Sequence, residues 1–143
     1  MPLKVVAYIT RGPRLLVFEH EGLPEAGLQV PAGTVEPGEP LEDALWREVF
    51  EESGLGRDEL CLQRWLAVMA HPAYDVVRHY AWLTARETTP DIWAHLVSGS
   101  GDDNGLTFNY RWETLPLVGL VDRFDEVLDR LPFQGGPAEA PGA

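Results

Sequence analysis

The sequence has almost no cysteine and almost no lysine. Cys61 is the only cysteine in 143 residues, so the chain can form neither an internal disulfide nor a zinc site built on paired cysteines. Lys4 is the only lysine, the remaining basic residues are scattered arginines, and the net charge is −12. Nucleic-acid binders usually show a basic stripe. None is present, so we do not expect a nucleic-acid partner.

The sequence also lacks a long apolar run. No stretch approaches the roughly 20 apolar residues of a membrane span. Segment 1–10 has neither the charged start nor the small-residue cleavage site of a signal peptide. We therefore expect a cytoplasmic protein without membrane contact. With 45% hydrophobic residues, the chain is expected to form one domain over 1–133, followed by a disordered Gly/Pro/Ala tail over 134–143.

Apolar patterning predicts strands and two helices. Segment 40–53 is predicted to be a helix, with Pro40 at its start and Gly54 just past its end. Apolar residues repeat at helical spacing over 120–131 and predict a C-terminal helix. Strands are predicted at 4–9, 15–18, 28–30, 60–69, 76–84, 93–97 and 107–112, and a loop at 32–38. This order predicts an α/β fold, a mixed β-sheet with both helices packed on it.

The helix predicted at 40–53 carries acids where its buried face should continue. With Leu41 at 0° and about 100° per residue, Leu45 lies near +40°, whereas Glu48, Glu52 and Glu51 lie near −20°, +20° and −80°. Acids on a helix usually form a solvated face, but these extend the apolar stripe and repel one another at i, i+3 and i, i+4. A hard cation relieves that repulsion, and Mg²⁺ and Mn²⁺ prefer carboxylate oxygens. The pattern therefore predicts a Mg²⁺ or Mn²⁺ site.

A longer motif surrounds these acids. Gly33 is followed by five residues and Glu39, and then by seven residues and the segment 47–55, with the sequence REVFEESGL. This spacing resembles the Nudix box, G-x5-E-x7-R-E-U-x-E-E-x-G-U with U an aliphatic residue, and every defined position matches. The resemblance implies a Nudix-type α/β/α sandwich over about residues 3–131. It also implies hydrolysis of a diphosphate linkage by attack of water on phosphorus.

The resemblance assigns catalytic roles by position. Glu48, Glu51 and Glu52 would bind Mg²⁺ or Mn²⁺, and the backbone carbonyl of Ala32 would add a ligand. Glu48 would also act as the base or orient the attacking water. Arg47 would hold the acids through a salt bridge.

Other residues have structural or weaker claims. By resemblance, Gly33 and Gly54 would be structural, and Glu39 would tie the preceding loop to the helix. Many family members use a further acid from a later loop, where the family often has Glu. Here the chain departs from that pattern, and the candidates are Asp103, Asp102 and Glu113.

Two further groups of residues have ordinary structural interpretations. The four histidines show no fixed spacing and are expected to be structural. Trp46 and Phe50 form a second apolar ridge on the helix, which the C-terminal helix or a second copy of the chain in a homodimer is expected to cover.

The resemblance leaves the substrate open. The leading expectation is a nucleotide-type small molecule, a nucleoside diphosphate linked to another moiety such as a sugar or ADP-ribose. Diadenosine polyphosphates and oxidised or ordinary nucleoside triphosphates are alternatives, because the subclass markers Pro72 and Tyr74, 17 and 19 residues past Leu55, fit no subclass cleanly. A module that senses a nucleotide without cleaving it is a further alternative. Such proteins usually lose box acids, and this chain keeps them.

Overall fold

The computed structural model describes residues 2–99, 101 and 103–132. The tail expected over 134–143 lies outside the described residues. The elements are β1 (Leu3–Arg11), β2 (Arg14–His20), the 3-10 turn η1 (Pro24–Ala26), β3 (Ala32–Thr34), α1 (Leu41–Ser53), β4 (Leu60–Ala70), β5 (Val77–Ala85), β6 (Ile92–Leu96), β7 (Thr107–Thr114) and the 3-10 turn η2 (Leu128–Arg130). In this part of the chain, no helix is long and apolar enough to span a membrane.

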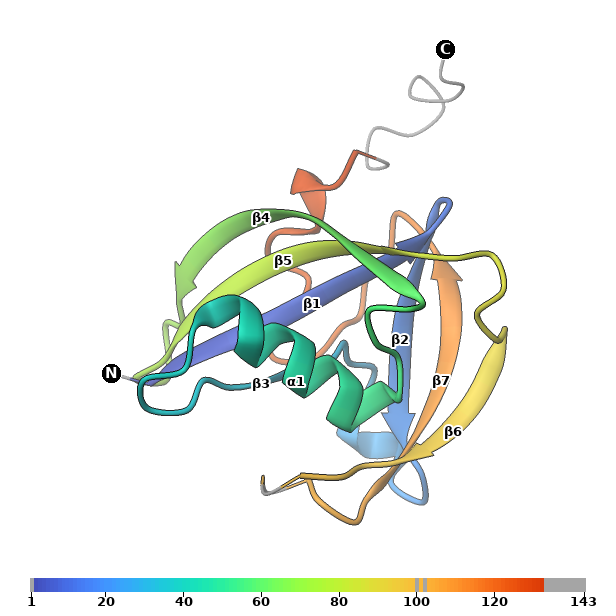
Figure 1. The fold of residues 1–143 in the computed structure, drawn as a ribbon, viewed down its shortest axis with the longest axis horizontal. Helices are drawn as coiled ribbons and strands as arrows, with labels where there is room; N and C mark the ends of the chain where they lie inside the picture. The colour runs from blue at the N-terminus through green and yellow to red at the C-terminus, as the bar shows by residue number, and fades with distance from the viewer. Residues whose placement is uncertain (1, 100, 102, 133–143) are drawn as a thin grey trace.

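The strands form one mixed sheet in the order β4-β5-β1-β2-β7-β6, with β3 paired to β1. β1 and β5 run parallel and the other pairs are antiparallel. β1 pairs with β2 only at Thr10 and Arg11, whereas residues 4–6 of β1 pair with β3. β1 and β2 therefore diverge, and α1 lies across the opening between them (Figure 1). The predicted α/β class is confirmed.

The helical phase expected for α1 is confirmed. Ala44, Leu45 and Val49 are buried in a cluster with one face of the sheet, and Leu41 packs half-buried at its edge. Gly54 ends the helix with a φ of 81°, the left-handed conformation that glycine adopts without a Cβ clash. The apolar stripe of α1 therefore fixes which way its acids point.

The prediction of a C-terminal helix over 120–131 is wrong. Apolar residues 120, 127, 128 and 131 are buried against the second face of the sheet, but the segment forms turns and η2. Asp122 and Arg123 have φ of 51° and 60°, which interrupts a right-handed helix. Buried Arg78 donates to both the backbone carbonyl and the carboxylate of Asp122, at 2.7 and 2.8 Å, and this contact outweighs the helical periodicity. An irregular segment therefore replaces the second helical layer.

The predictions of a strand at 28–30 and a loop at 32–38 are also wrong in position. Leu28 and Gln29 form only isolated bridges, and the strand here is β3, inside the segment 32–38 predicted as a loop. β3 satisfies the edge of β1 that β2 leaves unpaired. The glycine-rich sequence concealed this pairing, because glycine weakens a strand pattern.

Candidate active site

The C-terminal end of α1 is anchored by side chains from the β6–β7 hairpin. His95 Nε2 lies 3.0 Å from the carbonyl oxygen of Glu51, the Tyr110 hydroxyl donates to the carbonyl of Glu52 at 2.9 Å, and Trp93 Nε1 donates to the carbonyl of Ser53 at 2.9 Å. The carbonyl of Glu51 also accepts from the Ser98 backbone N–H at 3.1 Å, and those of Glu52 and Ser53 lie at a helix end, where intrahelical partners run out. The hairpin thus fixes the turn that carries two of the acids. The sequence offered no signal for this anchoring.

Glu52 is the most buried of the box acids. Its residue is 6% exposed, and its Oε1 accepts a hydrogen bond from the Ala32 backbone N–H at 3.1 Å. Burial raises the pKa of Glu52 well above its ordinary value, the Ala32 hydrogen bond opposes this rise, and the neighbouring charge of Glu48 adds to it. A carboxylate held here as an anion requires positive charge nearby.

Arg47 binds the first part of the motif and two of the acids together. Its Nε and Nη2 donate to both carboxylate oxygens of Glu39 at 2.8 Å, and its Nη1 donates to Glu48 Oε2 at 2.9 Å and to Glu51 Oε1 at 3.3 Å. The hydrogen bonds from Arg47 lower the pKa of Glu39 to about 2. Burial raises the pKa of Glu48, and its hydrogen bond to Arg47 opposes the rise. Arg47 therefore orients acids that would otherwise repel one another.

Two glycines leave room for the carboxylates. A Cβ built on Gly33 would fall on the carboxylate of Glu48, and one built on Gly99 would fall on that of Glu51. Gly33 was expected to be structural, and the close approach gives it a physical reason. Gly99 has a φ of 100° in the loop after β6, and sequence reasoning did not identify it.

The carbonyl of Ala32 faces the acids. The Ala7 N–H donates to the carbonyl of Pro31, and the Val35 N–H donates to the carbonyl of Leu3. Backbone groups alternate in direction along a strand, so Gly33, midway between Pro31 and Val35, also turns its N–H and C=O toward β1. Ala32, one residue out of phase, must direct both its N–H and its C=O away from β1. Its N–H reaches Glu52, so its C=O lies on the same side.

A cavity of about 440 Å³ gathers these groups. Its walls include Glu48, Glu51, Glu52 and the backbone of 32–34, and Lys4 and Asp103 line it as well. Asp103 adds to the raised pKa of Glu52, so the structure brings this candidate acid to the box. Glu113 instead pairs with Arg111 at 2.6 Å and does not line the cavity. Asp102 lies outside the described residues.

The donor groups suit a hard divalent cation in chemical kind. The carboxylates of Glu48, Glu51 and Glu52 line this cavity together with Ala32, and oxygen donors are what Mg²⁺ and Mn²⁺ take. In their present orientation the side chains do not form a complete metal site. Among residues 2–99, 101 and 103–132, no group of three Asp, Glu, His or Cys side chains is arranged to coordinate an ion. The reason is visible in the contacts, since Arg47 occupies oxygens of Glu48 and Glu51 while Glu52 turns to Ala32.

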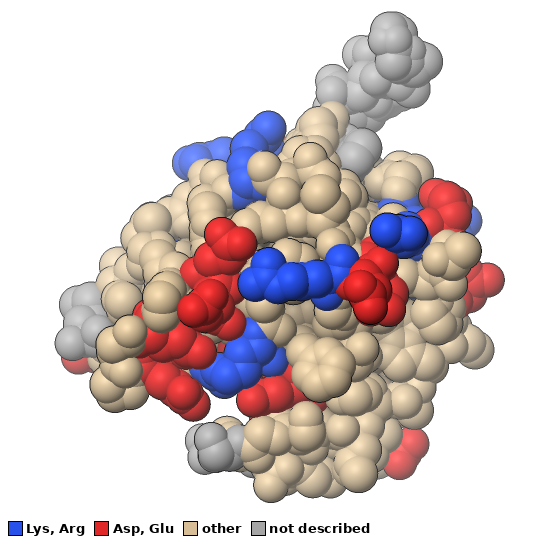
Figure 2. All heavy atoms as spheres, in the orientation of Figure 1, with Lys and Arg blue, Asp and Glu red and all other residues tan. Residues whose placement is uncertain are grey.

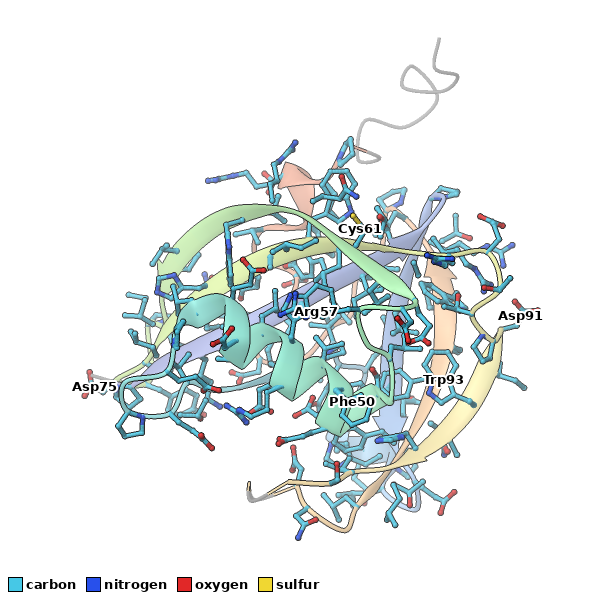
Figure 3. All side chains as sticks on the ribbon, in the orientation of Figure 1. Phe50, Arg57, Cys61, Asp75, Asp91 and Trp93 are labelled. Carbon is cyan, nitrogen blue, oxygen red and sulfur yellow. The ribbon has the colours of Figure 1, made fainter. Side chains whose placement is uncertain are left out.

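The outer ridge of α1 is partly covered within the chain. The Arg57 guanidinium lies 4.6 Å from the centre of the Trp46 ring, whereas Phe50 is 58% exposed near the end of the helix (Figure 3). Up to residue 132, where the described chain ends, no C-terminal helix covers this ridge, and a homodimer at Phe50 stays a prediction. Acidic side chains lie beside basic ones on this face (Figure 2), consistent with ion pairs rather than a basic stripe.

Comparison with known proteins identifies relatives of this arrangement. The family model described as NUDIX domain matches residues 1–126. A UDP-X diphosphatase structure aligns with a TM-score of 0.63 at 15% identity over 90% of this chain, which spans 60% of that protein's length. An ADP-ribose pyrophosphatase from Streptococcus suis aligns at 0.61 and 19% identity, covering 90% of this chain and 87% of that one. A MutT NUDIX hydrolase from Burkholderia pseudomallei aligns at 0.57 and 24% identity, covering 91% and 97%. At these identities the structures establish a shared fold.

Proposed function

The chain belongs to the Nudix hydrolase family of enzymes, and we propose that it hydrolyses a diphosphate linkage in a nucleoside diphosphate joined to another moiety, with Mg²⁺ or Mn²⁺ as cofactor. The observation that carries the proposal is the burial of Glu52 at a cavity that also holds Glu48, Glu51 and the Ala32 backbone. Such a cluster of anions is unfavourable on its own and becomes favourable once a cation and an anionic substrate enter together.

We assign cofactor binding to Glu48, Glu51, Glu52 and the carbonyl oxygen of Ala32. When bound, the divalent cation neutralises charge on the diphosphate and polarises the attacked phosphorus. Arg47 sets the direction of Glu48 and Glu51 through its bonds to Glu39. Asp103 is the candidate further acid, because it lines the same cavity.

Glu48 is the candidate base. Arg47 bonds to its Oε2, while Oε1 is not bonded to Arg47 and can accept a proton from the attacking water. The water oxygen then bonds to phosphorus as the bond to the leaving phosphate oxygen breaks. Burial raises the pKa of Glu48, which makes the carboxylate a better proton acceptor. The base thus combines orientation by Arg47 with a suitable proton affinity.

The substrate class rests on weaker support. Two structural relatives carry names that refer to a UDP derivative and to ADP-ribose, and both substances contain a nucleoside diphosphate. Nucleotide sugars and ADP-ribose are therefore the first compounds to test, followed by diadenosine polyphosphates and nucleoside triphosphates.

The test is a screen of these compounds with Mg²⁺ or Mn²⁺, read by product mass and repeated in EDTA. Single-turnover hydrolysis of the best substrate by Glu48→Gln should then be about 10²- to 10⁴-fold slower than by wild type. Glu42→Gln, an exposed change in the first turn of α1, is the matched control and should stay near wild type. Full activity in EDTA, or a Glu48→Gln rate within threefold of wild type, contradicts the proposal. Binding without cleavage of any compound favours a nucleotide-sensing module instead.

A further inference from the structure

Lys4 occupies the junction of two cavities. The acid-lined cavity of about 440 Å³ is joined by a second of about 230 Å³, and both are lined by Lys4, Ala32, Glu52 and Asp103. The second cavity continues to the Gln29 amide, to Asp122, whose carboxylate accepts from Arg78, and to four apolar side chains, Phe18, Val30, Val121 and Phe124. A substrate that spans both cavities therefore lies near the chain's only lysine.

The direction of Lys4 follows from strand alternation. Val6 and Tyr8 of β1 pack in the cluster on the second face of the sheet, and Val5 and Ala7 pack in the cluster with α1. Lys4 shares the parity of Val6, so its stem leaves the sheet toward the second cavity and Phe124. The four-carbon stem is flexible, which lets the ammonium group serve either cavity.

Lys4 is also the uncommitted cation at the site. Among the described residues that line the two cavities, the cations are Lys4 and Arg47, and Arg47 is bonded to Glu39, Glu48 and Glu51. Lys4 takes part in none of the ion pairs formed within residues 2–99, 101 and 103–132. Its charge acts on Glu52 only as a modest lowering influence on the pKa of that acid. Lys4 is half-buried and has no bonded anion among the described residues, so its ammonium group is available for an anion that arrives with the substrate.

We propose that Lys4 binds a phosphate oxygen of the substrate at this junction, with the diphosphate over the box acids and the attached group extending into the second cavity. The proposal rests on the proposed function, because it needs a phosphate-containing substrate. It makes Lys4 a substrate-binding residue outside the Nudix box. The competing role for Lys4 is structural, as a counter-charge for Glu52.

The chain's single lysine permits a direct test on the wild-type protein. The ε-amine of Lys4 is acetylated with an amine-reactive ester, and the rate is followed by peptide mass spectrometry against N-acetyl-lysine as an internal reference. The probe is α,β-methylene-ADP with Mg²⁺, whose binding is measured separately by calorimetry. We expect saturating probe to slow acetylation of Lys4 at least fivefold relative to Mg²⁺ alone.

Variants separate phosphate binding from counter-charge. Lys4→Met should weaken probe binding and raise the KM of the best substrate about 10- to 100-fold, with a smaller change in kcat, as expected for loss of a charged hydrogen bond. Lys4→Arg should restore part of the affinity. Arg14→Met, at the exposed first residue of β2 and outside both cavities, removes the same charge and should bind as wild type.

The outcomes distinguish this proposal from the one on which it rests. If the probe binds but leaves acetylation of Lys4 unchanged, or binds wild type and Lys4→Met equally, the role of Lys4 is refuted and the hydrolase proposal stands. A Lys4→Met variant that changes only Mn²⁺ affinity or thermal stability assigns Lys4 to Glu52 and also refutes it. If neither the probe nor any screened nucleotide binds wild type, both proposals fail together.

Discussion

Replacing Glu52 with glutamine should change stability in opposite directions with and without metal. Glu52 is 6% exposed and its carboxylate accepts one hydrogen bond from Ala32. Glutamine keeps that bond through its own Oε1, and its amide can donate to the Ala32 carbonyl, which faces the same side. Removing the buried charge should therefore stabilise the metal-free protein by about 1–3 kcal/mol, the range for relieving a buried polar group with too few partners. For a domain of this size the unfolding midpoint should rise roughly 3–10 °C.

Divalent cation should reverse this order. A ligand at 100 times its dissociation constant stabilises the native state by about 2.7 kcal/mol. Wild type should gain this stabilisation from Mn²⁺, whereas Glu52→Gln, which lacks one of the three acids, should gain much less. At one Mn²⁺ concentration the two proteins should be equally stable. Below this concentration the variant should be the more stable protein, and above it wild type should be.

The pH dependence adds a further check in EDTA. Burial raises the pKa of Glu52 above its ordinary 4.5, so the folded state holds this proton more tightly than the unfolded state. The stability that protonated Glu52 contributes to the wild-type fold is therefore fully present below about pH 4.5, and it is lost as the pH rises through the folded pKa. The two proteins should unfold alike in acid and diverge at neutral pH.

The assay is thermal unfolding in EDTA and across a Mn²⁺ titration, with isothermal calorimetry for affinity. Glu87→Gln, an exposed change in the loop after β5, is the control for removing one negative charge. A Glu52→Gln variant less stable than wild type in EDTA would refute the assignment of a costly buried charge. Equal stabilisation of both proteins by Mn²⁺ would refute the assignment of Glu52 to the metal.

Two further predictions concern the groups that position the acids. Gly33→Ala should lower kcat by about 100-fold with little change in the unfolding midpoint, because its Cβ displaces the carboxylate of Glu48. Gly56→Ala is the control, because its Cβ would meet no atom closer than 3.8 Å and Gly56 lines neither cavity; equal rates in the two variants would contradict the reasoning. Glu39→Gln should cost about 1–2 kcal/mol in urea unfolding at pH 7, since it removes an ion pair of Arg47 near the surface. The pKa of Glu39 is lowered to about 2, so its contribution is present above about pH 4.5 and lost as the pH falls toward 2; a deficit that does not shrink over that range would argue against the pair.

Local sequence was sufficient for the helix and the identity of its acids. The apolar positions of α1 occur at helical spacing, and burial of that stripe dictates that Glu52 points inward. The alternating strands were predicted for the same reason, since side-chain direction within one element depends only on nearby residues. The motif from Gly33 to Leu55 also identified Arg47 as the residue that holds the acids and Glu39 as the tie between loop and helix, whereas their mutual pairing through two bonds of 2.8 Å comes from the structure.

Contacts between distant segments decided the rest. The periodicity over 120–131 predicted a helix, but the partners required by buried Arg78 hold Asp122 in a conformation that a helix excludes. The His95, Tyr110 and Trp93 side chains that anchor α1 come from strands about 40 or more residues later, and a sequence pattern carries no record of such pairing. Lys4 likewise appears in the sequence as an ordinary strand residue. Only the folded chain places it in the lining of two cavities, beside β3 and the segment 121–124. Local periodicity reports which face is buried, and only the folded chain determines which groups meet there.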